Sequence, residues 1–300
     1  MALYVKKVNN IYLTNKSVNS FIKYIRYDLN ALIKIAKITA NYFKKNKRLN
    51  IKILDIGIGD GAFTIPILNT LFLNEGIDFY LDCFDISDFM IENLKRRLSE
   101  QEFLFEKVNY FKKDAEEGLI NTYPQNNYDL IIVTFVFHYI KNWKKLLKDI
   151  SKCLKNNGLF IQAEIIGDLR NVDGKFDVNS PTDFEKFWKA YFNERKKYSL
   201  WNPKISVSDL SKIYEYCLKN LPFKIYKQES FLWNIKITYR ELIDWIKNAP
   251  VSSLGSGLTN SKRENLAKKM KNWLKNNNIK IHNRINLRWG FKITWLRKSI

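Results

Sequence analysis

A glycine-rich turn carries the residues whose types and spacing point most directly to chemistry. The apolar pair Ile53-Leu54 leads into Asp55, and glycines then follow at 57, 59 and 61. Glycine lacks a Cβ, so a backbone built from alternating glycines can approach a bound molecule closely. A buried strand that runs through such a turn into a helix is shared by nicotinamide, flavin and adenosyl cofactor sites. The turn therefore predicts a nucleotide-like ligand; a tight turn without a ligand is the alternative.

Two more acidic residues follow the next apolar segments. Asp85 ends the segment 79–85 and precedes Ile86, and an acid at a strand end can accept hydrogen bonds from both hydroxyls of a ribose. Asp114 and Ala115 come after a third such segment. Asp85 as a simple strand cap and Asp114 as an ordinary loop acid are the structural alternatives.

The order of these motifs resembles the class I S-adenosylmethionine-dependent methyltransferases rather than the dehydrogenases. The glycine turn reads G-x-G-x-G, and not the G-x-G-x-x-G that cradles a pyrophosphate, because adenosylmethionine has no phosphate. The run Tyr128–Tyr139 resembles the fourth strand of that family. The turn after Leu154-Lys155 reads Asn-Asn-Gly where the family has Pro-Gly-Gly. The resemblance covers residues 51–165.

This resemblance implies S-adenosylmethionine as the cofactor, S-adenosylhomocysteine as the product, and a role for each matching residue. Asp55 with the three glycines would hold the methionine end, and Asp85 with Ile86 the ribose. Asp114 and Ala115 would bind the adenine. Near the sulfonium the cofactor would be lined by Thr134 and Phe135.

The outer segments resemble histamine N-methyltransferase and related small-molecule enzymes, and methyltransferases of carboxyl groups share part of that layout. The resemblance rests on a leading helix and on the aromatic segment 184–191. The acid that recognises histamine would fall near Asn30, so histamine is not the expected acceptor. Four aromatic residues are predicted to form the walls of an acceptor pocket: Phe21, Tyr139, Trp188 and Tyr191. The alternative is that they only pack the cap against the core.

His138 follows the fourth strand, where an imidazole could remove a proton from an attacking nitrogen or oxygen. Positioning of the acceptor in line with the S-methyl carbon is the alternative, because many enzymes of this type need no base. Cys83, Cys153 and Cys217 are widely spaced and predict small core residues. No metal site is expected, since the chain has two histidines and three cysteines in all.

The elements that must position these residues alternate between strand and helix. Apolar runs predict strands at 51–57, 79–85, 107–111, 128–135 and 159–165, with two longer aromatic strands at 223–237 and 285–296. Helical spacing predicts helices at 17–45, 61–74, 88–100, 141–155, 183–198, 239–248 and 261–276. The fold class is therefore α/β: a Rossmann-like, seven-stranded, mostly parallel sheet with an antiparallel last strand and a helical lid.

No Pro- or Gly-rich linker divides the chain, so one domain with elaborations is expected. Its parts are an N-terminal lid segment at 1–50, the cofactor-binding core at 51–165, a cap insertion at 166–221, and C-terminal strands and helices at 222–300 that complete the sheet. No apolar run approaches the length of a membrane span, and no secretory signal precedes the first motifs. A cytoplasmic protein is expected.

The net charge of +21 comes from the two ends of the chain. Residues 1–50 carry 11 Lys and Arg against one acid, and residues 251–300 carry 12 against one, whereas residues 51–100 carry four against nine. An AT-rich coding sequence produces such a lysine excess without any function. We expect methyl transfer to a nitrogen or oxygen of a small molecule; an RNA (tRNA or rRNA) methyltransferase and a non-catalytic cofactor-binding or scaffold protein are the alternatives.

Overall fold

The computed structural model describes residues 27–100, 107–120, 122–167, 183–198, 210–248 and 258–299. Within these ranges a seven-stranded sheet has the order β3-β2-β1-β4-β5-β7-β6. The strands are β1 (Asn50–Ile56), β2 (Asp78–Asp85), β3 (Val108–Lys112), β4 (Tyr128–Thr134), β5 (Leu154–Gly167), β6 (Phe223–Thr238) and β7 (Arg284–Lys298).

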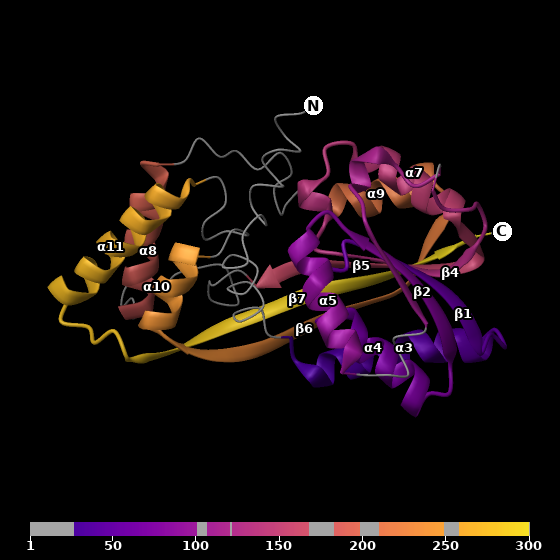
Figure 1. Cartoon of the computed structure of the whole chain (residues 1–300), viewed down its shortest axis with the longest axis horizontal. Coiled ribbons are helices and arrows are strands. Elements are labelled where there is room, and N and C mark those ends of the chain that lie inside the picture. The colour runs from indigo at the N-terminus through magenta and orange to yellow at the C-terminus, as the bar shows by residue number, and fades with distance from the viewer. Residues whose placement is uncertain are drawn as a thin grey trace. The chain divides into compact units, whose positions relative to one another are not determined.

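The sheet is parallel from β3 to β5 and antiparallel at its C-terminal strands. β1 pairs in parallel with β2 and β4, β2 with β3, and β4 with β5. The arrow of β7 points opposite to that of β5 (Figure 1). The predicted fold class, an α/β fold with a mostly parallel Rossmann-like sheet and antiparallel C-terminal strands, is confirmed, while the role of helices as a lid stays a prediction.

The helices are α3 (Leu29–Lys45), α4 (Thr64–Asn69) with a π-helical turn η1 (Thr70–Asn74), α5 (Asp88–Ser99), α7 (Trp143–Cys153), α8 (Asp183–Lys196), α9 (Leu210–Asn220), α10 (Tyr239–Asn248) and α11 (Asn260–Asn276), with 3-10 turns η2 (Ala115–Glu117) and η3 (Phe137–Tyr139). Polar side chains set several of their starts. Asp28 accepts from the Asn30 amide at α3, and Ser87 accepts from the Met90 amide at α5. Phe21 and residues 17–26 of the predicted leading helix lie outside the described residues.

The described residues group into two compact units. One contains those within 27–165, 203–231 and 292–300, and the other contains those within 166–202 and 232–291. In the first unit α7 and α9 cover one face of the sheet, and α3, α4 and α5 cover the other (Figure 1). The predicted boundaries at 50, 165 and 221 remain predictions.

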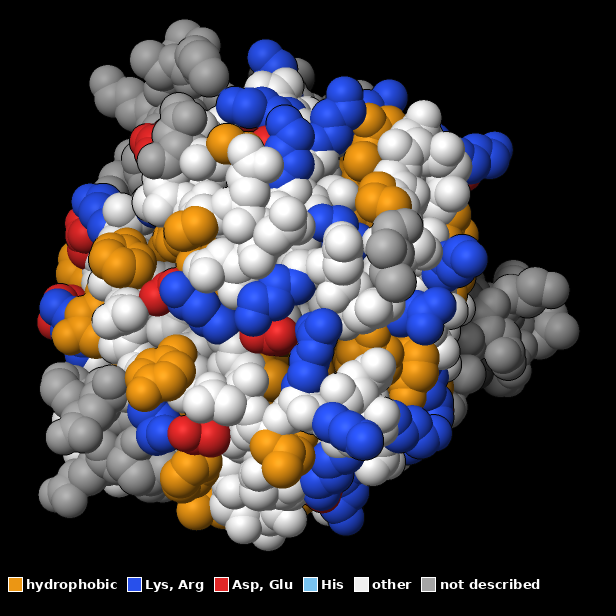
Figure 2. Space-filling view, turned by 90° about the vertical axis from the view of Figure 1, so that its right-hand side faces the viewer, with side chains coloured by type: hydrophobic (Ala, Val, Ile, Leu, Met, Phe, Trp, Pro, Cys, Tyr) orange, Lys and Arg blue, Asp and Glu red, His pale blue; other side chains and the backbone are white. Residues whose placement is uncertain are grey.

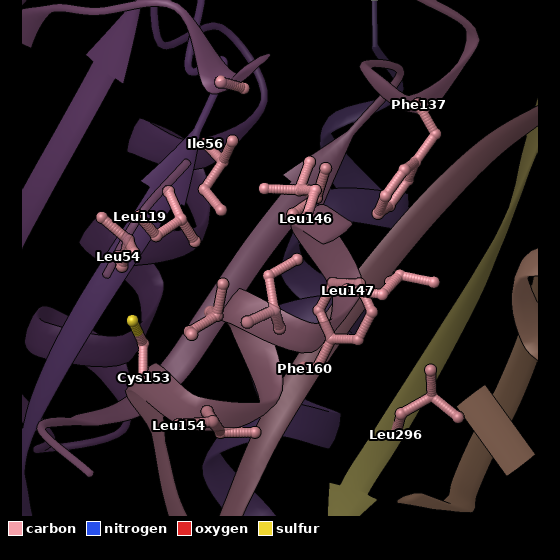
Figure 3. Packing of buried hydrophobic residues seen from close by; sticks show 14 of the residues in the cluster. Leu54, Ile56, Leu119, Phe137, Leu146, Leu147, Cys153, Leu154, Phe160 and Leu296 are labelled. Carbon is pink, nitrogen blue, oxygen red and sulfur yellow. The ribbon is translucent and has the colours of Figure 1, made fainter. Parts of the chain in front are cut away.

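Apolar packing holds α7 on its face of the sheet. Leu146 and Leu147 of α7 point toward the strands, where Ile56 and Phe160 lie (Figure 3). Burying a leucine side chain contributes about 1.5 to 3 kcal/mol, so these contacts fix the helix firmly. All three cysteines are buried and unlinked, as predicted; Cys153 belongs to this same cluster.

The second unit contains α8, α10 and α11. Phe187 of α8 contacts Tyr239 of α10 and Trp273 of α11, with ring centroids 5.2 and 5.8 Å apart. Lys269 of α11 pairs with Glu194 of α8 at 2.8 Å. Aromatic packing therefore joins the three helices, and the predicted aromatic segment forms the inner face of α8.

One predicted strand start is wrong. β5 begins at Leu154, where a helix was expected to continue to 155 and a strand to begin only at 159. The β4–β5 register shifts there, because Tyr128 pairs with Leu154 and Leu130 with Leu159. The extra residues form a bulge whose left-handed Asn157 has φ +55°.

A buried acid at the amino end of β4 ties this bulge to its surroundings. Asp129 accepts from Arg48 at 3.1 Å, from Lys155 at 2.7 Å and from the Lys52 amide at 3.0 Å. Arg48 also donates to the carbonyls of Asn156 and Asn157 in the bulge. The network lies at the amino ends of the parallel strands, whereas the glycine turn lies at their carboxyl ends, so the network supports the fold rather than the site.

The surface carries the basic excess. In Figure 2, Lys and Arg side chains outnumber Asp and Glu over the face shown. Exposed lysines follow the outer side of α7 and the turn before it, at positions 141, 144, 145, 148 and 152. None of them forms a salt bridge within the described part of the chain, whereas Lys34, Lys95 and Lys219 on other helices do.

Candidate functional site

The carboxyl end of β1 places a buried carboxylate in the middle of the sheet. The Asp55 side chain is fully buried, and its Oδ2 accepts from the Thr64 hydroxyl at 2.5 Å. Its Oδ1 is also buried and has no hydrogen-bond partner among the described residues. Burial raises the pKa of Asp55 to about 7 despite the bond from Thr64, and the nearby Asp85 raises it further. An unsatisfied buried carboxylate oxygen is costly and suits a cationic or hydrogen-bonding ligand.

The three glycines of the turn all have positive φ, yet their surroundings differ. A Cβ on Gly57 would lie 2.4 Å from a methyl of Val136, and one on Gly61 would lie 2.7 Å from Ile65. A Cβ on Gly59 would meet nothing within 4 Å. Gly57 and Gly61 are therefore required by the protein's own packing, whereas the space beside Gly59 is open to a ligand.

Asp85 closes the turn from the neighbouring strand. Its Oδ2 accepts from the Gly59 amide at 3.0 Å, and its Oδ1 accepts from the Ser87 amide at 2.9 Å. A carboxylate has further acceptor positions beyond these two. Burial raises the pKa of Asp85 to about 6, although the backbone donors oppose this shift. The side chain is half-buried, so a ligand beside Gly59 can reach it.

The loop after β3 lies next to Asp85. The Lys113 amide donates to the Asp85 carbonyl at 3.0 Å, and Asp114 caps η2 by accepting from the Glu116 amide at 2.9 Å. Ala115 is buried. Three groups of predicted residues thus lie together: the glycine turn, Asp85 with Ile86, and Asp114 with Ala115. Each follows the carboxyl end of a strand, and these ends lie on the same side of the sheet because the strands are parallel.

Three aromatic rings gather beside the turn: Phe135, which the sequence predicted, and Tyr27 and Phe63, which it did not. Tyr27 stacks on Phe135 with centroids 6.0 Å apart and planes 9° apart, and Phe63 meets both rings edge-on at 5.4 and 6.1 Å. Burial and the charges of Asp60 and Asp55 raise the pKa of Tyr27. Cations favour the faces of aromatic rings, so the cluster adds to a site suited to positive charge.

The end of β4 carries the predicted sulfonium-lining residues. Thr134 is buried and ends β4, and Phe135 has φ +58°, which is rare for a residue with a side chain. The ring of this residue is the one that stacks on Tyr27. His138 lies in the next turn, η3, and Tyr139 is half-buried.

The remaining predicted wall residues lie in the second unit. Trp188 and Tyr191 are fully buried there, and their rings stack with centroids 5.0 Å apart. Burial also raises the pKa of Tyr191. Their role as acceptor contacts stays a prediction.

A second buried acid, also missed from the sequence, braces the turn. Asp60 pairs with Arg97 of α5 at 2.5 Å, and the Asp60 carbonyl accepts from the same guanidinium at 3.0 Å.

Within the described ranges no three His, Cys, Asp or Glu side chains gather as metal ligands would. In the same ranges no helix is long and apolar enough to cross a membrane.

Known proteins resemble this chain in sequence and in fold. Residues 54–160 match the family described as "Methyltransferase domain". The malonyl-[acyl-carrier protein] O-methyltransferase 2 of Ilyobacter polytropus is 30% identical over 218 residues, which are 70% of this chain and 68% of that protein. The ubiquinone/menaquinone biosynthesis C-methyltransferase UbiE of Rickettsia akari is 25% identical over half of this chain and 54% of its own length.

Among solved structures, a Bacillus halodurans C-125 protein assigned as a methyltransferase superposes with a TM-score of 0.52 at 15% identity, covering 91% of this chain and 99% of that one. At this identity the likeness shows the fold alone.

The fold, the site and these relatives define the class: the chain belongs to the class I S-adenosylmethionine-dependent methyltransferases. It is a methyl-transferring enzyme, and its cofactor is S-adenosylmethionine. The resemblance of the outer segments to histamine N-methyltransferase stays a prediction.

Proposed function

We propose that this enzyme transfers the methyl group of S-adenosylmethionine to a nitrogen or oxygen of a small-molecule acceptor. The observation that carries the proposal is the open space at Gly59: the Gly59 amide donates to Asp85, and the strand that leads into the turn carries Asp55, whose Oδ1 has no hydrogen-bond partner among the described residues. Two carboxylates around an open backbone fit a ligand that carries hydroxyls and positive charge.

In this proposal each residue around the turn has one task. Asp55 and the glycine turn hold the methionine end, Asp85 with Ile86 accepts from the ribose, and Asp114 with Ala115 binds the adenine. Thr134 and the rings of Tyr27, Phe63 and Phe135 line the sulfonium side. The unsatisfied Asp55 oxygen and the raised pKa values of Asp55 and Asp85 support this set, because a bound cation would lower both pKa values.

S-adenosylmethionine supplies an electrophilic methyl carbon and a sulfur that leaves with the C–S bonding electrons. The acceptor's lone pair forms the new bond in line, and any proton on the attacking atom must then depart. His138, just past the end of β4, is the candidate to take that proton. The protein's larger contribution is to hold the acceptor in line and to exclude water.

Methyl transfer from labelled S-adenosylmethionine to panels of amines, carboxylic acids and tRNA tests the proposal. We expect product with a small acceptor, at a rate that changes little between low and physiological salt. A product formed only with tRNA, and lost steeply as salt rises, would instead establish the RNA alternative. Cofactor binding without transfer to any panel member would favour the non-catalytic alternative.

A second candidate narrows the acceptor to the carboxyl group of an acyl chain attached to a carrier protein. The Ilyobacter polytropus relative is named for O-methylation of such a malonyl group. The exposed lysines along the outer side of α7, which form no salt bridge with other described residues, also favour an acidic partner. Methyl-ester formation on malonyl-carrier protein, compared with free malonate under the same conditions, distinguishes the two candidates.

A further inference from the structure

The side chain of Glu116 connects the loop that follows β3 with the segment that follows β4. Its carboxylate oxygen Oε1 accepts from the Lys141 amide, and the Asn142 amide lies 3.4 Å from the same oxygen. Asn142 is the N-cap of α7 and Lys141 precedes it, and both lie shortly after the turn η3 that contains His138. Glu116 itself follows Asp114 and Ala115. The carboxylate therefore ties the proposed adenine loop to the segment that follows β4.

The geometry explains why this contact is needed. Asn142 stands at the N-cap of α7 but makes no side-chain cap hydrogen bond. The first amides of a helix need acceptors from elsewhere, and a carboxylate there is also favoured by the helix dipole. Glu116, from another loop, supplies that acceptor to the N-cap amide of Asn142 and also accepts from the amide before it, that of Lys141.

A second contact fixes the other end of the same loop to the same helix. The Leu119 amide donates to Asp149 of α7 at 3.0 Å, and this bond is buried. Gly118, between the two contacts, has φ +88°, and a Cβ there would lie 3.0 Å from the Asp149 carboxylate. The loop 114–119 and α7 are thus clamped at two points, so a shift of one must move the other.

We propose that Glu116 is a positioning residue that couples cofactor binding to the order of segment 136–142. Occupation of the Asp114-Ala115 loop fixes Glu116, and Glu116 then fixes the start of α7 and the turn with His138 before it. The acceptor therefore meets an ordered segment only when the methyl donor is bound. This inference rests on the proposed role of Asp114 and Ala115.

Hydrogen–deuterium exchange with and without S-adenosylhomocysteine tests the coupling. In the native chain we expect the ligand to slow amide exchange in two segments, the glycine turn at 57–63 and the remote segment 136–142. In Glu116→Ala we expect protection at 57–63 to remain and protection at 136–142 to be lost. Glu116→Gln, which keeps an acceptor oxygen, should restore most of it, and the exposed neighbour provides the matched control, Glu117→Ala.

Kinetics supply an independent readout. Loss of one charge-assisted hydrogen bond corresponds to about a tenfold effect, so kcat for Glu116→Ala should fall about tenfold while the Kd of S-adenosylhomocysteine changes much less. Protection at 136–142 that persists in Glu116→Ala, or that is lost equally in Glu117→Ala, would overturn the coupling. Absence of protection at 57–63 in the native chain would overturn the proposed cofactor site and the coupling together.

Discussion

Replacing Asp55 with asparagine tests whether a buried carboxylate is held in the site at the expense of stability. The native pKa of Asp55 is about 7, against an ordinary value of 3.8. Between these values the folded state binds more protons than the unfolded state, so the free energy of unfolding falls as pH rises and the fall ends above pH 7. From pH 5 to pH 8 the fall covers about two pKa units, or about 2 to 3 kcal/mol at 1.36 kcal/mol per unit.

That figure is an upper value, because local relaxation and entering water reduce the penalty of a buried charge. An asparagine side chain cannot ionise, so Asp55→Asn should lose this part of the pH dependence and keep only the smaller part due to Asp85. The stability of this variant at one pH is less informative, since the amide leaves a buried donor unsatisfied.

Urea denaturation of the ligand-free protein at pH 5 and pH 8 measures the effect. The matched control is Asp88→Asn, which removes an exposed carboxylate paired with Lys112; it should leave the native pH dependence in place. Saturating S-adenosylmethionine should also flatten the pH dependence of the native protein, because its positive charges favour ionised Asp55. An Asp55→Asn variant whose stability still falls as steeply as that of the native chain would refute the reasoning.

Four further substitutions separate ligand contacts from packing. Gly59→Ala should cost about 1 to 2 kcal/mol from its left-handed backbone, yet weaken S-adenosylhomocysteine binding at least tenfold by calorimetry. Gly61→Ala should lose a further 1 to 3 kcal/mol or so in denaturation because its Cβ meets Ile65; equal effects of the two would contradict the assignment. Asp85→Ala should fold and bind S-adenosylhomocysteine at least about tenfold more weakly, and unchanged affinity would remove Asp85 from the site. Asp129→Ala should lower the free energy of unfolding by about 2 to 3 kcal/mol while cofactor affinity stays within error. A large loss of affinity would show that the amino ends of the strands influence the site at their carboxyl ends.

The sequence predicted those features that depend on local pattern. Strands β1 to β4 are short apolar runs between turn residues, and the glycine turn with Asp85 has a recognisable spacing, so both were predicted from the residues alone. The β5 bulge was not, because it depends on Arg48 and Tyr42, which reach the Asn157 carbonyl from segments far away in the chain. A helix was extended through 155 in its place.

Phe135 was predicted beside the sulfonium, but its grouping with Tyr27 and Phe63 escaped prediction for the same reason. Tyr27 precedes a helix, Phe63 ends a turn and Phe135 follows a strand, and no window of sequence contains more than one of them. Phe135 has a left-handed φ. The sequence could not predict this, because residues with a side chain as large as phenylalanine rarely adopt a positive φ. Thr64 donates a hydrogen bond to one of the two carboxylate oxygens of Asp55, yet in the sequence it looks like an ordinary helix residue. A side chain that acts through a distant partner leaves no periodic signal.

The charge distribution shows why a whole-chain total is a poor guide to this site. The chain carries +21 overall, yet Asp55, Asp60 and Asp85 gather around one turn within a segment that is itself acidic. Only Asp60 of these three has a cationic partner in the described residues, namely Arg97. Desolvated charges act strongly over short distances, whereas exposed lysines are screened by water and salt. In the proposed site, a cofactor bearing a sulfonium and an ammonium would therefore meet these carboxylates, and we propose that the basic surface bears instead on which acceptor, free or carrier-bound, reaches the site.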